Sequence, residues 1–158
     1  MGWVTISLRK MTLKNRINTL ESDLIRISQQ LQTVANNSSY EQQAGQLQYN
    51  YDTAVINAAY MNNINGINTT ATGNVNDQLA TQKQIIQANL IYNNQKQNAE
   101  SIFNAKNQTR QAIADAQTQA LEAQQEQIET QLKAARAEYE SLGQAMDTDI
   151  KNGAIKLA

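Results

Sequence analysis

The sequence offers few residue combinations that could perform catalysis. It contains no His and no Cys, which removes the commonest general base, the commonest metal ligand and any thiol nucleophile. A Ser–Lys pair could act as nucleophile and base, but no spacing singles out one Ser and one Lys. Paired carboxylates hydrolyse glycosides only across a cleft, and two packed helices do not form one. We therefore predict no enzymatic activity and no cofactor.

One short stretch looks like the beginning of a calcium-binding loop. The segment "DTDIKN" (147–152) places Asp147 and Asp149 two residues apart, as in the first and third positions of an EF-hand loop. The fifth position is Lys151, the glycine required at the sixth is Asn152, and no closing Glu follows. We interpret this segment as a solvated helix end and predict no metal site.

The most regular feature of the sequence is a heptad repeat near its beginning. Apolar residues there are spaced alternately four and three apart, with polar residues between them: Leu13, Ile17, Leu20, Leu24, Ile27, Leu31 and Val34. This spacing places them on one narrow stripe of a helix, as in a coiled coil. An amphipathic helix on a globular core is the alternative, although its stripe is usually wider. The register extends backward through Ile6 and Trp3, with Lys10 as a polar member.

A second long helix is predicted over residues 78–151. Its first apolar stripe consists of Ile85, Ala88, Tyr92, Ala99, Ile102, Ile113, Ala116 and Ala120. The stripe then shifts to Leu121, Ile128, Leu132, Ala135, Tyr139, Leu142 and Met146. Such a shift is expected where the apolar period is closer to 3.6 than to 3.5 residues.

Two polar segments interrupt the helical pattern. Residues 35–45 contain neighbouring Asn and Ser residues, which favour turns or caps, and end at Gly45. We expect a kink or a short break there, after which the stripe resumes at Leu47, Tyr51, Ala54, Ala58 and Met61. Residues 62–77 contain Gly66, Gly73 and many Asn residues, so the chain is predicted to reverse there.

These elements predict an all-α fold, an elongated antiparallel coiled-coil helical hairpin with a kink in its first arm. It forms a single domain over 1–158, with arm one at 3–61, the turn at 62–77, arm two at 78–151 and a frayed tail at 152–158. The absence of Pro leaves no position that must break a helix. The two heptad seams face each other in this arrangement.

Composition narrows the classes of partner. The 13 basic and 14 acidic residues nearly balance, so no basic field attracts nucleic acid or an anionic membrane. No apolar stretch is long enough to span a bilayer. The N-terminal "MGWVTISLRK" is not a cleavable signal, because its basic residues follow a short apolar run. We expect neither nucleic-acid binding nor membrane contact.

The N-terminal segment leaves three interpretations open. Trp3, Val4, Ile6 and Leu8 precede several basic residues, a pattern that can lie on a membrane surface. The same segment could dock into a neighbouring subunit. It could also begin the coiled coil, with Trp3 capping the core.

Apolar residues outside the seams indicate that other chains cover part of the hairpin. The off-phase positions are Ile25, Val55, Ile56, Ile64, Ile86, Leu90, Ile91 and Phe103. A lone hairpin would leave this second stripe in water. We therefore expect a self-assembling structural subunit, with copies of itself as the main partner. The candidate assembly seam consists of Leu13, Ile17, Leu20, Leu24, Ile27, Leu31, Val34, Leu121, Ile128, Leu132, Tyr139, Leu142 and Met146.

The layout resembles flagellin and the filament subunits exported by type III secretion systems. The stretches that carry the resemblance are "LESDLIRISQQLQTVANNSSYEQQAG" near the N-terminus and "LKAARAEYESLGQAMDTDI" near the C-terminus. The resemblance implies an extracellular filament or cell-surface appendage, exported without a cleaved signal peptide, with an export chaperone as a further partner. The alternatives are a phage virion protein, a small helical adaptor or chaperone-like module, and a cytoplasmic location.

Overall fold

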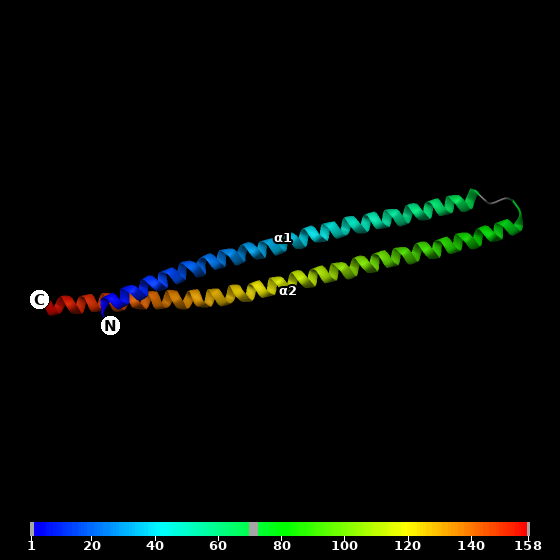
Figure 1. Cartoon of the computed structure of the whole chain (residues 1–158). Helices are drawn as coiled ribbons and strands as arrows, with labels where there is room; N and C mark the ends of the chain where they lie inside the picture. The colour runs from blue at the N-terminus through cyan, green and yellow to red at the C-terminus, as the bar shows by residue number, and fades with distance from the viewer. Residues whose placement is uncertain (1, 70–72, 158) are drawn as a thin grey trace. The chain divides into compact units, whose positions relative to one another are not determined.

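The computed structural model describes residues 2–69 and 73–157, with side chains given through residue 153 except at Thr69. It contains two helices in this part of the chain, α1 (Trp3–Thr69) and α2 (Val75–Leu157). The described residues form no strand, and the two helices pack against each other (Figure 1). The predicted all-α helical hairpin is therefore confirmed.

Both helices are longer than predicted. α1 continues to Thr69 and α2 begins at Val75, so the turn is much shorter than the predicted 62–77. The Asn-rich end of α1 remains helical because Ile64 and Ile67 turn away from solvent there, and Ile67 is only 9% exposed. At the other end α2 continues to Leu157, where a frayed tail was predicted.

No break occurs at residues 35–45. α1 is helical throughout that segment, so of the two expected alternatives, a kink or a short break, the break is wrong. Asn and Ser only weakly disfavour a helix interior, and no Pro is present to force an interruption. Gly45 is buried, although its neighbours on either side are exposed. The glycine thus belongs to the packed face of the helix.

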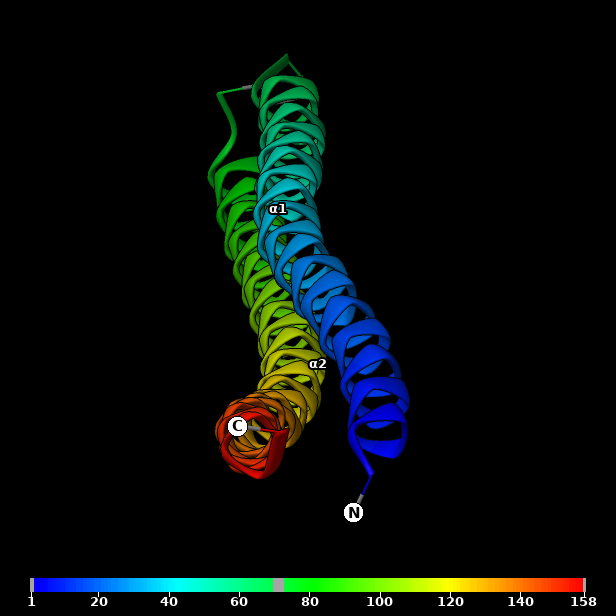
Figure 2. The same ribbon diagram turned by 90° about the vertical axis from the view of Figure 1, so that its left-hand side faces the viewer.

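The chain divides into two compact units, and both helices contribute to each. Unit 1 consists of residues 1–35 and 115–158, and unit 2 of residues 36–114. In both units α1 and α2 run antiparallel and lie side by side (Figures 1 and 2). The division falls where the predicted heptad seam of α1 ends.

Unit 1 has the packing of a heptad coiled coil. Every seventh residue of α1 is buried, namely Ile6, Leu13, Leu20 and Ile27. The opposing stripe of α2 includes Leu132 and Ala135, which are 7% and 4% exposed. A strict seven-residue repeat keeps one seam facing the partner helix through a left-handed supercoil. The packing of unit 1 therefore agrees with the predicted heptad coiled coil.

Polar contacts at the edges of unit 1 agree with the antiparallel register. Arg9 pairs with Glu138, and Arg136 pairs with Glu21. The Lys10 ammonium lies 4.8 Å from the centre of the Tyr139 ring, a cation–π distance. These side chains are substantially exposed, so each ion pair contributes at most about 1 kcal/mol. The apolar seam supplies most of the stability of this unit.

Unit 2 follows a different repeat. The inward positions of α1 are spaced four, four and three residues apart: Gly45, Tyr49, Thr53, Ile56, Tyr60, Ile64 and Ile67. The corresponding positions of α2 include Asp77, Thr81, Ile85, Ala88, Tyr92, Ala99, Phe103, Asn107, Arg110 and Ala114. An eleven-residue repeat of this kind has 3.67 residues per turn and favours a right-handed supercoil. The two units therefore use two different helix-packing periods.

Aromatic rings and amides fill the interface of unit 2. Tyr49 stacks on Phe103 with ring centres 4.7 Å apart, and the centres of Tyr60 and Tyr92 are 4.5 Å apart. The Tyr60 hydroxyl donates a hydrogen bond to Asn89 at 2.6 Å. In the reverse direction the Tyr92 hydroxyl donates to Asn57 at 2.7 Å. The tyrosines thus bury their rings while their polar ends remain hydrogen-bonded.

Candidate assembly surfaces

The predicted assembly seam lies inside the hairpin. All thirteen of its residues belong to unit 1 and are buried or half-buried. Leu13 and Leu20 of α1 form one core cluster with Leu132 and Ala135 of α2. The remaining clustered members pack against these four, namely Ile17, Leu24, Ile128, Tyr139 and Leu142. Because the seam is occupied by the same chain, a surface for other chains has to lie elsewhere.

The N-terminal extension of the seam is only partly as predicted. Ile6 is buried, at 3% exposure, whereas Trp3 is 65% exposed. The segment therefore does begin the coiled coil at Ile6, but Trp3 does not cap the core of its own hairpin, and that part of the interpretation is wrong. Val4, Leu8 and Met11 are also exposed and lie at i, i+4 and i+7, so they share one helix face. The N-terminus thus presents a short apolar stripe outside the coiled coil.

The predicted continuation of the stripe through the middle of the chain is wrong for α1 and partly right for α2, where Ile85, Ala88, Tyr92 and Ala99 do face α1. Leu47, Tyr51 and Met61 are exposed in α1, and Ile102 and Ile113 are exposed in α2. The residues that instead face the other helix include three that were expected on the second stripe, Ile56, Ile64 and Phe103. The prediction assumed a break that would reset the helix phase near Gly45. Because α1 is continuous, the residues that face α2 keep the helical phase set by Val34 and Ser38.

This packing turns an apolar face of α1 toward solvent in unit 2. We call it the α1 outer face, and it consists of Tyr40, Ala44, Leu47, Tyr51, Ala54, Val55 and Ala58. The exposed fractions are 70% for Tyr40, 69% for Leu47 and 67% for Tyr51. No Lys or Arg occurs between Arg26 and Lys83. The α1 outer face is therefore a continuous apolar surface without basic side chains.

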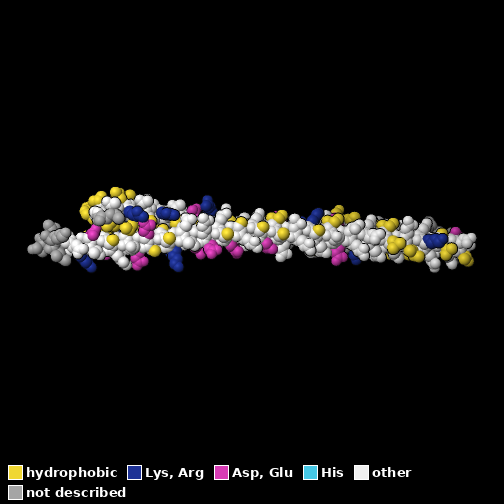
Figure 3. Space-filling view, turned by 90° about the horizontal axis from the view of Figure 1, so that it is seen from below, with side chains coloured by type: hydrophobic (Ala, Val, Ile, Leu, Met, Phe, Trp, Pro, Cys, Tyr) yellow, Lys and Arg dark blue, Asp and Glu magenta, His cyan; other side chains and the backbone are white. Residues whose placement is uncertain are grey.

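A second apolar surface lies on α2 near the turn. We call it the α2 outer face, and it consists of Val75, Leu79, Ile86 and Leu90, all more than half exposed. Hydrophobic side chains gather there around a basic side chain (Figure 3). Lys83 follows Leu79 by four residues in this stretch of α2. Unit 2 thus exposes one apolar face on each helix.

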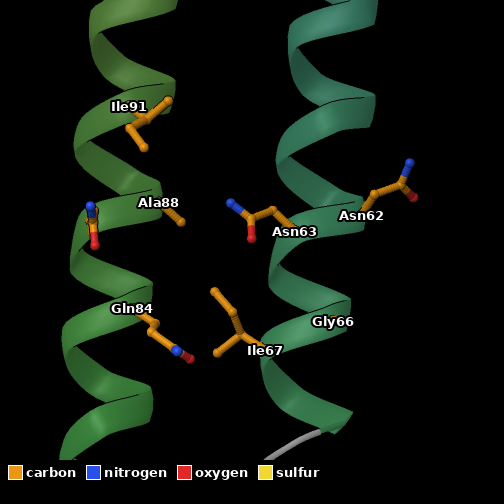
Figure 4. Close-up of a pocket in the computed structure, with 8 residues that line it drawn as sticks. Asn62, Asn63, Gly66, Ile67, Gln84, Ala88 and Ile91 are labelled. Carbon is orange, nitrogen blue, oxygen red and sulfur yellow. The ribbon is translucent and has the colours of Figure 1, made fainter.

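The groove beside the turn has no catalytic groups. It encloses about 440 Å³ and is lined by Asn, Gln, Gly, Ala and Ile side chains of both helices. Ile67 and Ala88 point toward each other across it, and Asn63 points in the same direction (Figure 4). None of the residues that line it carries a charge. This groove has neither a nucleophile nor an acid–base pair.

A second groove of about 340 Å³ in unit 2 surrounds Gly45 and Arg110. Arg110 occupies an inward position of α2, and its guanidinium lies over Gly45 of α1. Its Nη1 donates a hydrogen bond to Asn107 at 3.2 Å. A side chain on residue 45 would overlap the guanidinium. The glycine that sequence alone marked as a helix-weakening residue thus makes room for a large cation within the helix interface.

We expect a measurable coupling between these two residues. Gly45→Ala should stabilise the Arg110→Ala variant by about 1 kcal/mol, the helix-propensity difference between Gly and Ala. In the natural background the gain should be smaller, because the new methyl group displaces Arg110 from its position. Urea denaturation of the four proteins of this double-mutant cycle measures the difference. An identical effect of Gly45→Ala in both backgrounds would contradict the assigned contact.

Other kinds of site find little support in the described part of the chain. Neither described helix has a stretch long and apolar enough to cross a bilayer. Among the described residues no group of three or more acidic side chains is placed to hold a metal ion. Comparison with protein-family models, curated proteins and solved structures gives no match. The two apolar outer faces are the most distinctive features that could carry a function.

Proposed function

We propose that this protein is a structural subunit that assembles with copies of itself. The observation that carries the proposal is the amount of surface left in water. The chain exposes 11747 Å² at a mass of 17.6 kDa, whereas a folded monomer of that mass exposes about 7,900 Å². A standard protein interface removes roughly 800 Å² from each partner. The excess is therefore large enough for several interfaces.

The exposed surface is also of the right kind for assembly. The outer faces of unit 2 present Tyr40, Leu47 and Tyr51 on one helix and Leu79 and Leu90 on the other. Burying one such side chain contributes roughly 1.5–3 kcal/mol. Contiguous apolar patches on soluble proteins usually mark interaction sites. Association would recover stabilisation that the hairpin by itself does not obtain.

The position of these faces favours an open polymer over a closed dimer. The α1 outer face and the α2 outer face belong to different helices, and each points away from the helix interface. A subunit with two separate contact faces binds a neighbour at each, and such contacts produce fibres when they do not close into a ring. We therefore propose a filament or another polymeric appendage outside the cell, as the resemblance to secreted filament subunits implies.

A helical adaptor is the second candidate function. The α2 outer face has apolar residues at i, i+4, i+11 and i+15, a spacing that can receive one amphipathic client helix. In that case the protein would remain a small oligomer and bind another protein through this face.

Electron microscopy of the purified full-length chain distinguishes the two functions. The assembly proposal predicts fibres, sheets or large rings that grow in number with protein concentration. Leu79→Ser combined with Leu90→Ser should shorten or abolish them, whereas Gln78→Ser with Asn93→Ser is the matched control on exposed polar positions of α2. Uniform small particles at every concentration would contradict assembly and favour the adaptor.

A further inference from the structure

We propose that the beginning of α1 binds the surface of an anionic lipid membrane. The contact consists of three exposed apolar side chains, Val4, Leu8 and Met11, together with the basic side chains beside them. We call these three residues the N-terminal stripe, and they belong to unit 1. Lipid binding goes beyond the proposed self-assembly and does not depend on it, because the outer faces of unit 2 take no part in it.

The N-terminal stripe points away from the other helix. Its members are 53%, 60% and 62% exposed, whereas Ile6 and Leu13 of the seam are buried. Each member lies two residues from one of these seam positions, which is about 200° around a helix. Figure 3 shows hydrophobic side chains gathered at this end of α1, with basic side chains next to them. A flat surface can therefore meet the stripe without disturbing the coiled coil.

The part of α1 that carries the stripe is strongly basic. Residues 3–20 contain no Asp or Glu, and their basic members are Arg9, Lys10, Lys14 and Arg16. Lys14 and Arg16 are exposed, and the ion pairs of the described residues include neither of them. Around the helix, Lys14 lies about 60° to one side of Met11, and Arg16 lies about 80° to the other side of Leu8. Two available cations thus flank the stripe.

The neighbouring acidic side chains do not cancel this charge. Glu21 and Asp23, the first acidic residues of α1, pair with Arg136 and Arg26. Glu138 pairs with Arg9 and belongs to α2, on the opposite side of α1 from the stripe. The expectation of no membrane contact rested on the charge balance of the whole chain. That balance does not describe the field at the stripe, which is positive.

The combination of residue types fits a lipid surface better than another polyanion. Trp3 is 65% exposed and lies eleven residues, or three turns, before Lys14, so both are on the same side of the helix. Trp side chains favour the boundary between headgroups and acyl chains. Lys and Arg can lay their apolar stems along such a boundary while their charged ends reach the phosphates. A nucleic acid would leave the apolar stripe in water.

The size of the stripe predicts shallow, reversible binding. From Val4 to Met11 the helix is about 10 Å long, so its side chains reach only the headgroup boundary of one leaflet. An apolar contact this small needs a second source of affinity, and the basic side chains supply it. Each basic side chain near an anionic surface raises the affinity about fivefold. Binding should therefore require anionic lipid.

The fluorescence of Trp3 tests the proposal, because Trp3 is the single Trp of the sequence. The full-length chain is mixed at low salt with phosphatidylcholine vesicles that contain one third phosphatidylglycerol, and with vesicles of phosphatidylcholine alone. With the anionic vesicles we expect the emission maximum to move to shorter wavelength and the chain to sediment with the lipid. Added salt should reverse both changes, because it screens the charges of protein and lipid. The neutral vesicles should cause neither change.

Two double variants separate the apolar from the electrostatic contribution. Leu8→Ser combined with Met11→Ser should lower the affinity for the anionic vesicles more than tenfold, because the apolar contact is lost. Lys14→Gln combined with Arg16→Gln should also lower it more than tenfold. All four side chains are exposed, so the helix content should not change. Circular dichroism checks this.

Matched controls place the same changes elsewhere on the chain. Ile25→Ser with Ile113→Ser removes two exposed apolar side chains, and Lys83→Gln with Lys106→Gln removes two exposed basic ones. Both controls should bind the anionic vesicles as the natural chain does. If the controls lose as much affinity as the test variants, the N-terminal stripe is not the contact.

The remaining outcomes contradict lipid binding without touching self-assembly, which sedimentation without lipid measures separately. Binding to neither kind of vesicle, or equally to both, would show that the stripe has no affinity for anionic lipid. If the Trp3 emission instead moves with rising protein concentration in the absence of lipid, and vesicles cause no further change, the stripe packs against another copy of the chain. In that case a protein, and not a membrane, covers it.

Discussion

Replacing Ile27 with Asp should unfold unit 1. Ile27 is the most deeply buried large side chain among the described residues, at 1% exposure. The substitution removes its packing and places a carboxylate in the seam between the helices, for which we expect a loss of about 4 kcal/mol. Circular dichroism at 222 nm should show reduced helix content. Hydrogen exchange should show faster exchange in residues 1–35 and 115–153.

Ile25→Asp is the matched control for this substitution. The two isoleucines lie two residues apart on the same helix, and Ile25 is 62% exposed. The same chemical change at Ile25 should alter the free energy of unfolding by less than about 1 kcal/mol. Similar destabilisation by both variants would show that the described burial of the α1 seam is wrong.

Substitutions on the α1 outer face should strongly reduce the association constant between chains. Leu47→Glu combined with Tyr51→Glu should reduce the association constant more than a hundredfold, about 2.7 kcal/mol. The variant removes two large, exposed apolar side chains from the α1 outer face and places two carboxylates there. Glu is a good helix former, so the hairpin should keep its helix content. Sedimentation equilibrium of the natural and variant chains measures the change.

Gln46→Glu combined with Asn50→Glu controls for the added charge. It introduces two carboxylates into the same segment at exposed positions outside the α1 outer face. Association of this variant should fall less than tenfold. If both double variants weaken association equally, the effect comes from net charge, and the α1 outer face has no special role.

The packing of unit 1 could be predicted from the sequence because one period explains it. From Leu13 to Val34 almost all large apolar side chains lie on a single stripe. Only one face of the helix can then be buried, and the heptad spacing selects a partner helix of the same kind. The antiparallel hairpin followed from the second seam and the single Gly- and Asn-rich turn.

The packing of unit 2 could not be predicted in the same way because two faces of α1 compete there. Leu47 and Tyr51 on one face are about as apolar as Tyr49 and Ile56 on the other. Hydrophobicity alone does not distinguish them. The face of α1 that packs against α2 is determined by the continuity of the helix through residues 35–45, together with the eleven-residue spacing. The eleven-residue spacing of these inward residues is present in the sequence, and it was the signal that could have identified the inward face.

The contact between Gly45 and Arg110 could not be predicted from the sequence either. A glycine within a helical pattern is usually read as a weak point, and an arginine as a solvated side chain. In the structure they form one contact between the helices. Neither residue alone indicates the other, because their juxtaposition depends on the register of α1 and α2 in unit 2.

Sedimentation equilibrium of the full-length chain over a wide concentration range tests whether one hairpin leaves too much apolar surface in water to remain alone. We predict a weight-average mass that rises with concentration to at least twice 17.6 kDa. A mass that stays at 17.6 kDa up to the highest soluble concentration, with the helix content intact, would show that the hairpin is stable alone and does not assemble.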